Sequence, residues 1–142
     1  MADLSDDEYE RLLEFRDGLR RFQRWSEDQA GAAGLTPAQH QLLLAIRGHS
    51  GPGDPTIGDV ADHLLLRHHS VVGLANRAEA AGLVRRWADP DDQRVVRLSL
   101  TKAGARRLAK LSTAHLEELR RLTPRFRALW TDLDVEVSPA AS

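Results

Sequence analysis

Residues 56–100 hold the pattern that most restricts the fold of this chain. Apolar side chains recur at helical spacing over residues 56–63, and again over residues 67–81. Only a short connection at Leu65 and Leu66 separates the two helical segments. Crude alternation then predicts a β-hairpin over residues 83–100. A short helix, a tight turn, a second helix and a hairpin, in this order, are typical of a winged helix-turn-helix.

Local signals mark where these elements begin and end. Thr56 and Asp59 form a variant of the capping box at the start of the short helix. Gly82 is placed to end the following helix, and a polar, proline-containing turn at residues 89–93 divides the hairpin. Thr101 is expected to cap a long helix that begins at residue 102.

Helical patterns flank this region on both sides. An apolar stripe predicts a first helix over residues 6–29, and the Thr36-Pro37 pair predicts the start of a second. After residue 102 the apolar positions approach a heptad spacing, which is expected of a helix that packs against a partner. Thr123-Pro124 is expected to end this helix near residue 122 and to start a short one that reaches Leu133.

The predicted fold class is therefore mainly α with a small β-hairpin wing. The expected organisation is an N-terminal dimerisation helix in residues 1–34, a DNA-binding lobe in 35–101, C-terminal dimerisation helices in 102–134, and a disordered tail in 135–142. Long apolar stripes outside the central lobe need a partner, and a second copy of the chain is the simplest one.

The amino-acid composition excludes several classes of function. The chain has 142 residues, the size of one domain, and contains no cysteine, which excludes disulfides, thiolate metal sites and thiol redox switches. The first 30 residues are acidic, with five Arg and nine Asp or Glu, and carry neither the apolar segment of a signal peptide nor a membrane span. We expect a cytoplasmic protein. The middle of the chain is mildly basic, and its arginines cluster at positions 85, 86, 94 and 97.

The helix predicted over residues 67–81 has an unusual outward face. Its core face consists of Val71, Leu74, Ala75 and Ala78. Its outward face consists of His69, Val72, Gly73, Asn76 and Ala80, with His68, Ser70 and Arg77 at the margins. Small side chains allow a backbone to come close to a bulky partner, and the DNA major groove admits such a helix. Packing against another helix explains this face equally well when it is taken alone, and the neighbouring hairpin favours DNA.

Other kinds of site fit these residues poorly. His68 and His69 are adjacent, so on a helix their side chains point about 100° apart and do not converge on a metal ion. The acidic run at residues 89–92 lacks the glycine and the later glutamate of a calcium loop. Ser70 and His69 cannot form a nucleophile–base pair as helical neighbours, and no glycine-rich phosphate loop is present. We therefore expect no enzyme and no cofactor.

Several motifs together resemble the MarR family of bacterial transcription regulators. These are LTPAQHQLLLAI, a helix that ends in NRAEAAGLV, the turn DPDDQR and the hairpin exit VRLSLTKAG, over about residues 35–104. The resemblance implies an obligate, triangular homodimer that reads a palindromic operator with two recognition helices. It also implies that the wing tip reaches the minor groove. The family pattern of aspartate, any residue and arginine is matched by Asp92-Gln93-Arg94.

On this basis a DNA-binding set can be named. It comprises Thr56, Arg67, His68, His69, Ser70, Val72, Gly73, Asn76, Arg77, Arg86, Asp92 and Arg94. Three positions depart from the family pattern, because Arg67 stands where a small N-cap is usual, Leu65 where a glycine is frequent, and Gly73 where a basic residue is common. These departures affect individual base contacts rather than the fold.

The resemblance also implies regulation by a ligand, because many family members bind small, often aromatic anions between the dimer base and the DNA-binding lobe. In this chain that region is expected to be lined by Phe22, Trp25, Gln29, His40 and Leu43, with core packing as the alternative role of each. The functional hypothesis is a repressor released by such a ligand. The alternative is a helical homodimeric adaptor that binds no DNA, which leaves the arginine-rich hairpin unexplained.

Overall fold

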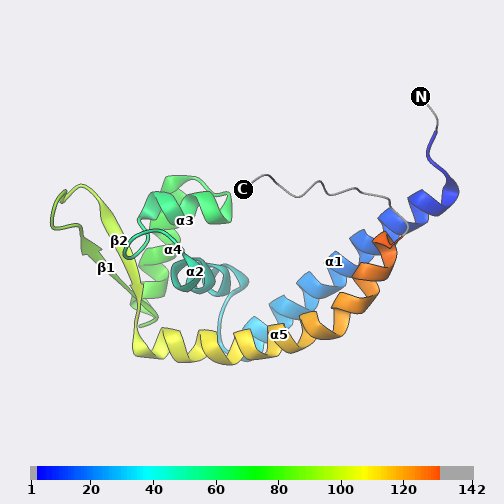
Figure 1. Cartoon of the computed structure of the whole chain (residues 1–142). Helices are drawn as coiled ribbons and strands as arrows, with labels where there is room; N and C mark the ends of the chain where they lie inside the picture. The colour runs from blue at the N-terminus through cyan, green and yellow to red at the C-terminus, as the bar shows by residue number, and fades with distance from the viewer. Residues whose placement is uncertain (1–2, 132–142) are drawn as a thin grey trace.

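The computed structural model describes residues 3–131, so the predicted helix end at Leu133 and the predicted tail 135–142 lie outside the described residues. Figure 1 shows a lobe at one end of the molecule and two long helices that extend from it as an arm. In chain order the elements are α1 (Asp6–Ala32), α2 (Pro37–Gly48), α3 (Ile57–Leu64), α4 (His68–Ala80), β1 (Val84–Ala88), β2 (Val96–Leu100) and α5 (Lys102–Trp130). The predicted fold class is confirmed.

Helix starts follow from local side-chain hydrogen bonds. The Thr56 hydroxyl accepts the Asp59 N–H at 3.0 Å, and the Asp59 carboxylate accepts the Thr56 N–H at 2.9 Å, which confirms the predicted capping box of α3. That backbone N–H is the main reason why the pKa of Asp59 lies below its usual value. Thr36 and Thr101 cap α2 and α5 as predicted, and Ser5 caps α1. These contacts fix the starts of α2 and α3 in the lobe and of α1 and α5 in the arm.

The core of the lobe lies between α2, α3, α4 and the hairpin. Its most buried large side chains are Leu42, Leu43, Val60, Val71, Leu83, Val84 and Leu98. β1 and β2 pair antiparallel from Val84 opposite Leu100 to Ala88 opposite Val96. The chain before α3 adds to the outer side of β2, because the Leu98 N–H donates to the Pro55 carbonyl at 2.9 Å. The hairpin is therefore attached to the helix-turn-helix on two sides.

The predicted break at Thr123-Pro124 is wrong, because α5 runs without interruption from Lys102 to Trp130. The Thr123 hydroxyl donates to the Leu119 carbonyl at 2.6 Å, as a residue inside a helix does, instead of capping a new one. A proline inside a helix costs about 3 kcal/mol. Packing against α1 offsets this cost.

That packing is aromatic and close. The ring centroid of Phe15 on α1 lies 5.6 Å from that of Phe126 and 5.3 Å from that of Trp130. A Cβ at Gly18 would lie only 2.7 Å from Phe126 Cε1, so this glycine lets the ring lie against the α1 backbone. α1 and α5 lie side by side along the arm (Figure 1). Within residues 3–131 no helix has the length and apolar character needed to cross a membrane.

Candidate nucleic-acid interface

α4 separates its core side chains from an open face as the sequence predicted. Val71, Leu74, Ala75 and Ala78 are buried. On the other side His69, Asn76 and Arg77 are exposed, whereas Val72 and Gly73 are half-buried. A Cβ at Gly73 would meet only the tip of Arg77, whose Nη1 would be 3.3 Å away. The glycine therefore lies on a surface and leaves room for a close approach to its backbone.

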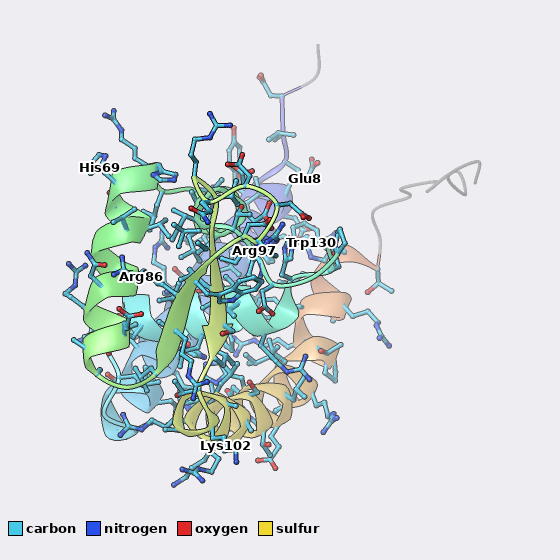
Figure 2. All side chains as sticks on the ribbon, turned by 90° about the vertical axis from the view of Figure 1, so that its left-hand side faces the viewer. Glu8, His69, Arg86, Arg97, Lys102 and Trp130 are labelled. Carbon is cyan, nitrogen blue, oxygen red and sulfur yellow. The ribbon has the colours of Figure 1, made fainter. Side chains whose placement is uncertain are left out.

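The N-terminal end of α4 is open to solvent. Arg67 occupies the N-cap without a side-chain cap hydrogen bond, and His68 and His69 are both exposed. The N–H groups of a first helical turn have no partner within the helix, and they carry partial positive charge. This end of α4 thus presents two imidazoles and free N–H groups to a negatively charged partner. Figure 2 shows His69 at the outer end of the helix, beside the hairpin.

The tip of the hairpin holds the predicted aspartate–arginine pair. The Arg94 side chain is 91% exposed, and its Nε and Nη2 donate to the two carboxylate oxygens of Asp92 at 3.1 and 3.3 Å. The Arg94 backbone N–H donates to the same carboxylate at 3.1 Å. These bonds hold the pKa of Asp92 below its usual value, with the Arg94 side chain as the largest cause. Asp92 therefore stays ionised and fixes the direction of an otherwise free guanidinium.

Arg97 is a positioning residue that the sequence did not single out. Its Nε donates to Asp89 Oδ2 at 2.5 Å and its Nη1 donates to the Asp54 carbonyl at 2.6 Å. The Trp87 indole N–H donates to the Asp54 carboxylate at 3.2 Å. The Arg97 side chain is only 24% exposed, and Figure 2 labels it beside the strands of the hairpin. It ties the hairpin to the loop that precedes α3.

Arg86 ties the other side of the hairpin to α4. Its backbone N–H and its Nη2 donate to the Glu79 carboxylate at 3.0 and 3.3 Å. Figure 2 shows Arg86 between α4 and the strands. Any phosphate contact by Arg86 competes with Glu79, whereas Arg94 at the tip remains exposed.

A groove of about 320 Å³ lies between α4 and the wing. It is lined by Thr56, Ile57, Gly58, His68, Val72, Arg86, Arg94, Val95 and Val96. Five residues of the predicted DNA-binding set thus meet here from four parts of the chain. The remaining members, namely Arg67, His69, Ser70, Gly73, Asn76, Arg77 and Asp92, are not among the groove lining.

The residues predicted to bind a ligand do not all meet. Phe22 and His40 line a hollow of about 340 Å³ between α1, α2 and α5. Trp25 lines a different hollow between α1 and α5, Gln29 lines a third, and Leu43 is fully buried in the core of the lobe. The first hollow is completed by residues that the sequence did not single out, namely Ser26, Gln41, Leu44, Ser112, His115, Leu116 and Leu119.

Sequence comparison places the lobe in one family. Residues 33–95 match the MarR family model. Two Bacillus subtilis proteins are similar: the uncharacterized HTH-type transcriptional regulator YsmB is 35% identical over 74 residues, covering 52% of this chain and 51% of YsmB. The HTH-type transcriptional repressor MdtR is 32% identical over 71 residues, covering 50% of this chain and 44% of MdtR. The chain thus spans about half the length of the curated relatives it matches.

Solved structures extend the similarity to most of the chain. The transcriptional regulator PA4135 is 30% identical, with a TM-score of 0.66 and coverage of 81% of this chain and 80% of that one. The Staphylococcus aureus MepR–DNA complex shares the fold, with a TM-score of 0.69, 20% identity and coverage of 87% and 85%. These relatives are regulators, in agreement with the prediction that the chain is not an enzyme. Because residues 33–95 match the family model and most of the chain matches a transcriptional regulator at 30% identity, the chain belongs to the MarR family.

Proposed function

We propose that the protein is a sequence-specific, double-stranded DNA-binding transcriptional regulator that acts as a homodimer, most simply as a repressor in the cytoplasm. The observation that carries the proposal is the groove between α4 and the wing, with an open helix face on one side and an exposed guanidinium on the other. MepR, which has the same fold, is named as a DNA complex.

α4 is proposed to enter the major groove. Its outward side chains are short around Gly73, so the helix backbone can come close to base edges. Asn76 can read an adenine edge and Val72 can meet a thymine methyl, whereas Ser70 and Arg77 are placed for phosphates. His68 and His69 lie at the open N-terminus of α4, where a phosphate or a base acceptor is favoured.

The wing is proposed to reach the neighbouring minor groove. A narrow minor groove has an enhanced negative potential that attracts an inserted arginine. Arg94 is the exposed member of the Asp92–Arg94 pair and is held in one direction by it. Arg97 and Arg86 anchor the wing from below, so Arg94 is presented on a rigid support.

The arm is proposed to form the dimer. α1 and α5 leave large apolar side chains open to solvent, which are Tyr9, Leu12, Leu13, Leu19, Leu116 and Leu119. A contiguous exposed apolar surface marks an interaction site in a soluble domain. A second copy packed on this surface produces two recognition helices related by a two-fold axis. Such a pair reads two half-sites about 34 Å apart.

Repression and its release are the finer part of the proposal. MdtR is named a repressor, and this chain is proposed to block transcription in the same sense. A small, apolar anion is proposed to bind in the hollow that includes Phe22 and His40, at the junction of arm and lobe. A ligand at this junction changes the spacing of the two α4 helices and so releases the operator.

A salt titration separates the regulator from a helical adaptor that binds no DNA. Affinity for a duplex is measured by mobility shift or anisotropy as the salt concentration increases. Each phosphate contact lowers the logarithm of the binding constant by about 0.9 per tenfold rise in salt, so a regulator loses affinity steeply. An adaptor shows no duplex binding at low salt, and that result would overturn the proposed function.

A further inference from the structure

Two histidines from different helices meet at the surface of the lobe. His49 follows the last residue of α2 as its C-cap, and His63 lies in the last turn of α3. The Nδ1 atom of His49 lies 3.0 Å from the Nε2 atom of His63. The ring planes are inclined by 77°, so the rings do not stack and the two nitrogens face each other. Neither ring lines the groove between α4 and the wing, so the proposed DNA contacts leave this pair unexplained.

The ring of His49 is held in one orientation by its surroundings. Its side chain is only 14% exposed, and a carboxylate oxygen of Asp59 lies 3.5 Å from its Nε2. A Cβ at Gly51 would collide with the same Nε2, so the loop after α2 passes directly against the ring. A carboxylate favours a hydrogen on the ring nitrogen that it faces. The neutral ring of His49 therefore presents the lone pair of Nδ1 to His63.

Asp59 is itself fixed by the capping box of α3. Its Oδ2, the oxygen that faces His49, also accepts the Thr56 N–H at 2.9 Å. This hydrogen bond is the largest cause that lowers the pKa of Asp59, so the carboxylate is ionised at neutral pH. Metal sites commonly contain such a carboxylate, which orients a histidine whose other ring nitrogen binds the ion. Asp59 and His49 thus form a preorganised pair of this kind.

His63 supplies the second nitrogen and remains accessible to solvent. In the hydrogen bond between the rings, the Nε2 of His63 donates to the lone pair of His49 Nδ1. When the hydrogen of His63 is carried on its Nδ1 instead, Nε2 also has a lone pair. The two rings stay neutral, so no net proton is released. Two lone pairs then point at the same space, where a cation can accept both.

The spacing of the two nitrogens suits a tetrahedral metal ion. Zn²⁺ binds imidazole nitrogen at about 2.0–2.1 Å, and a tetrahedral angle then places two such nitrogens about 3.3 Å apart. The observed separation is 3.0 Å, so a small rotation of the exposed His63 ring completes the geometry. No three His, Cys, Asp or Glu side chains within residues 3–131 are grouped to hold a metal ion. Water must therefore fill the remaining coordination positions.

We propose that His49 Nδ1 and His63 Nε2 together bind one Zn²⁺ ion per chain, with Asp59 as the positioning residue of His49. Imidazole ligands suit Zn²⁺, whereas Mg²⁺ prefers oxygen ligands. The ion joins the end of α2 to the end of α3, across two residues that are 14 positions apart in the chain. This site is separate from the DNA-binding groove and does not rest on the proposed function.

A bound ion is expected to stabilise the lobe. The unfolded chain does not hold the two histidines together, so Zn²⁺ binds the folded chain preferentially and raises its midpoint of thermal unfolding. The bridged segment includes Asp54, whose carbonyl and carboxylate bind Arg97 and Trp87 of the hairpin. Zn²⁺ thus strengthens the part of the lobe that supports the wing, without itself touching the groove.

Titration calorimetry with zinc chloride, on the full chain after removal of metals by a chelator, tests the proposal. The number of ions bound per chain is compared among the wild type, His49→Gln and His63→Gln. Each substitution alone should remove one ion per chain and the thermal stabilisation that goes with it. Magnesium chloride should not bind at this pair. In nitrogen-resolved NMR spectra of the imidazoles, zinc should move the hydrogen of His63 from Nε2 to Nδ1.

Asp59→Asn tests the positioning residue. Asparagine can still cap α3, but it lacks the charge that orients His49, so zinc affinity should fall about 10- to 100-fold. Asp62→Asn is the matched control, because it removes an exposed carboxylate of the same helix and should leave zinc affinity unchanged. A purely structural role of Asp59 would lower the unfolding temperature without zinc and leave the zinc affinity of the folded chain unchanged.

Three results would overturn the proposal. The first is a wild-type protein that binds no zinc. The second is a folded His63→Gln variant that binds as many ions as the wild type. This exposed position keeps the test decisive even if His49→Gln does not fold, which circular dichroism checks. The third is an ion that is lost from one folded variant and kept in the other, because a single histidine would then hold it.

Discussion

At the residue scale, single side chains determine how α4 and the wing are held in place. Leu65 is an example, because it ends α3 in the left-handed region with φ of 55° and ψ of 41°. It is 91% exposed, so its side chain gains little from burial. Left-handed backbone costs a residue with a Cβ about 1–2 kcal/mol. The turn between α3 and α4 therefore keeps a conformation that its own residue disfavours.

Leu65→Gly is predicted to stabilise the protein. Glycine adopts positive φ without strain, which stabilises the folded chain. It also has more entropy in the unfolded chain, so the free energy of unfolding should rise by only about 0.5–1 kcal/mol. Urea unfolding at a fixed protein concentration measures it. Leu66→Gly is the control, because Leu66 lacks the positive φ and should lose stability on substitution. A less stable Leu65→Gly variant would show that the leucine makes a contribution beyond its backbone.

Asp89 makes stability dependent on pH. Hydrogen bonds from Arg97, and then from the backbone N–H of Asp91, lower its pKa. As the pH falls, the unfolded chain therefore takes up a proton before the folded one does. The contribution of ionised Asp89 to the free energy of unfolding is complete above the pKa of an unfolded aspartate, about 3.9. It is lost as the pH falls through the lower pKa that Asp89 has in the folded protein.

Asp89→Asn is accordingly predicted to be less stable than the wild type near neutral pH. The difference in unfolding free energy should shrink as the pH falls below about 4. Denaturant unfolding at a series of pH values measures it. A difference that stays constant or grows on acidification would exclude the Asp89–Arg97 bond as its source.

At the scale of elements, the sequence predicted what short-range chemistry determines. The caps at Thr36, Thr56 and Thr101 involve a side chain and a backbone group three residues away, so they are visible in the sequence. Pro124 also carries a local signal, but packing of Phe126 against Gly18 on α1 overrides it. Sequence periodicity cannot reveal a contact between residues more than a hundred positions apart.

The surface formed by α4 and the wing was likewise predictable where it depends on local spacing, and not where it depends on contacts between distant residues. The buried and open faces of α4 follow from helical spacing and were predicted. Arg97 was missed because its partners, Asp89 and the Asp54 carbonyl, lie 8 and 43 positions away and share no repeating pattern with it. The hollow between α1, α2 and α5 contains only Phe22 and His40 of the predicted ligand-binding residues, because the residues that meet there come from three helices.

Gly73→Leu is predicted to separate folding from DNA binding. The new side chain points into open space apart from the tip of Arg77, and leucine is a better helix former than glycine by about 0.5–1 kcal/mol. Stability should therefore hold or rise, whereas duplex binding should be abolished because the helix can no longer approach the bases. Gly48→Leu at the end of α2 is the matched control, since a Cβ there meets no described atom within 4 Å. Tight duplex binding by Gly73→Leu would place the helix elsewhere.

Arg94→Ala tests the wing. The side chain is 91% exposed, so thermal stability should be unchanged. Loss of a DNA contact costs about 1–3 kcal/mol, a decrease in affinity of about 5- to 150-fold in mobility-shift titrations. Arg85→Ala, which removes another exposed arginine of the hairpin outside the groove, controls for net charge. Equal losses in the two variants would mean that the wing contributes charge only.

At the scale of the whole molecule, the arm and the lobe have complementary tasks. The lobe places α4 and Arg94 around one groove, and the arm leaves a long apolar surface that a second copy can cover. The junction of arm and lobe contains the His40–His115 hollow. In the proposed function, a ligand bound at this junction acts where a small rotation changes the distance between the two α4 helices of a dimer.

The central claim is that two copies of this chain read one DNA duplex through α4 and the wing. Selection of bound duplexes from a random pool, followed by sequencing, tests it most directly. The account predicts an inverted repeat whose half-site centres lie about one helical turn, or 34 Å, apart. A pool without enrichment, or an enriched single half-site without its inverted copy, would contradict it.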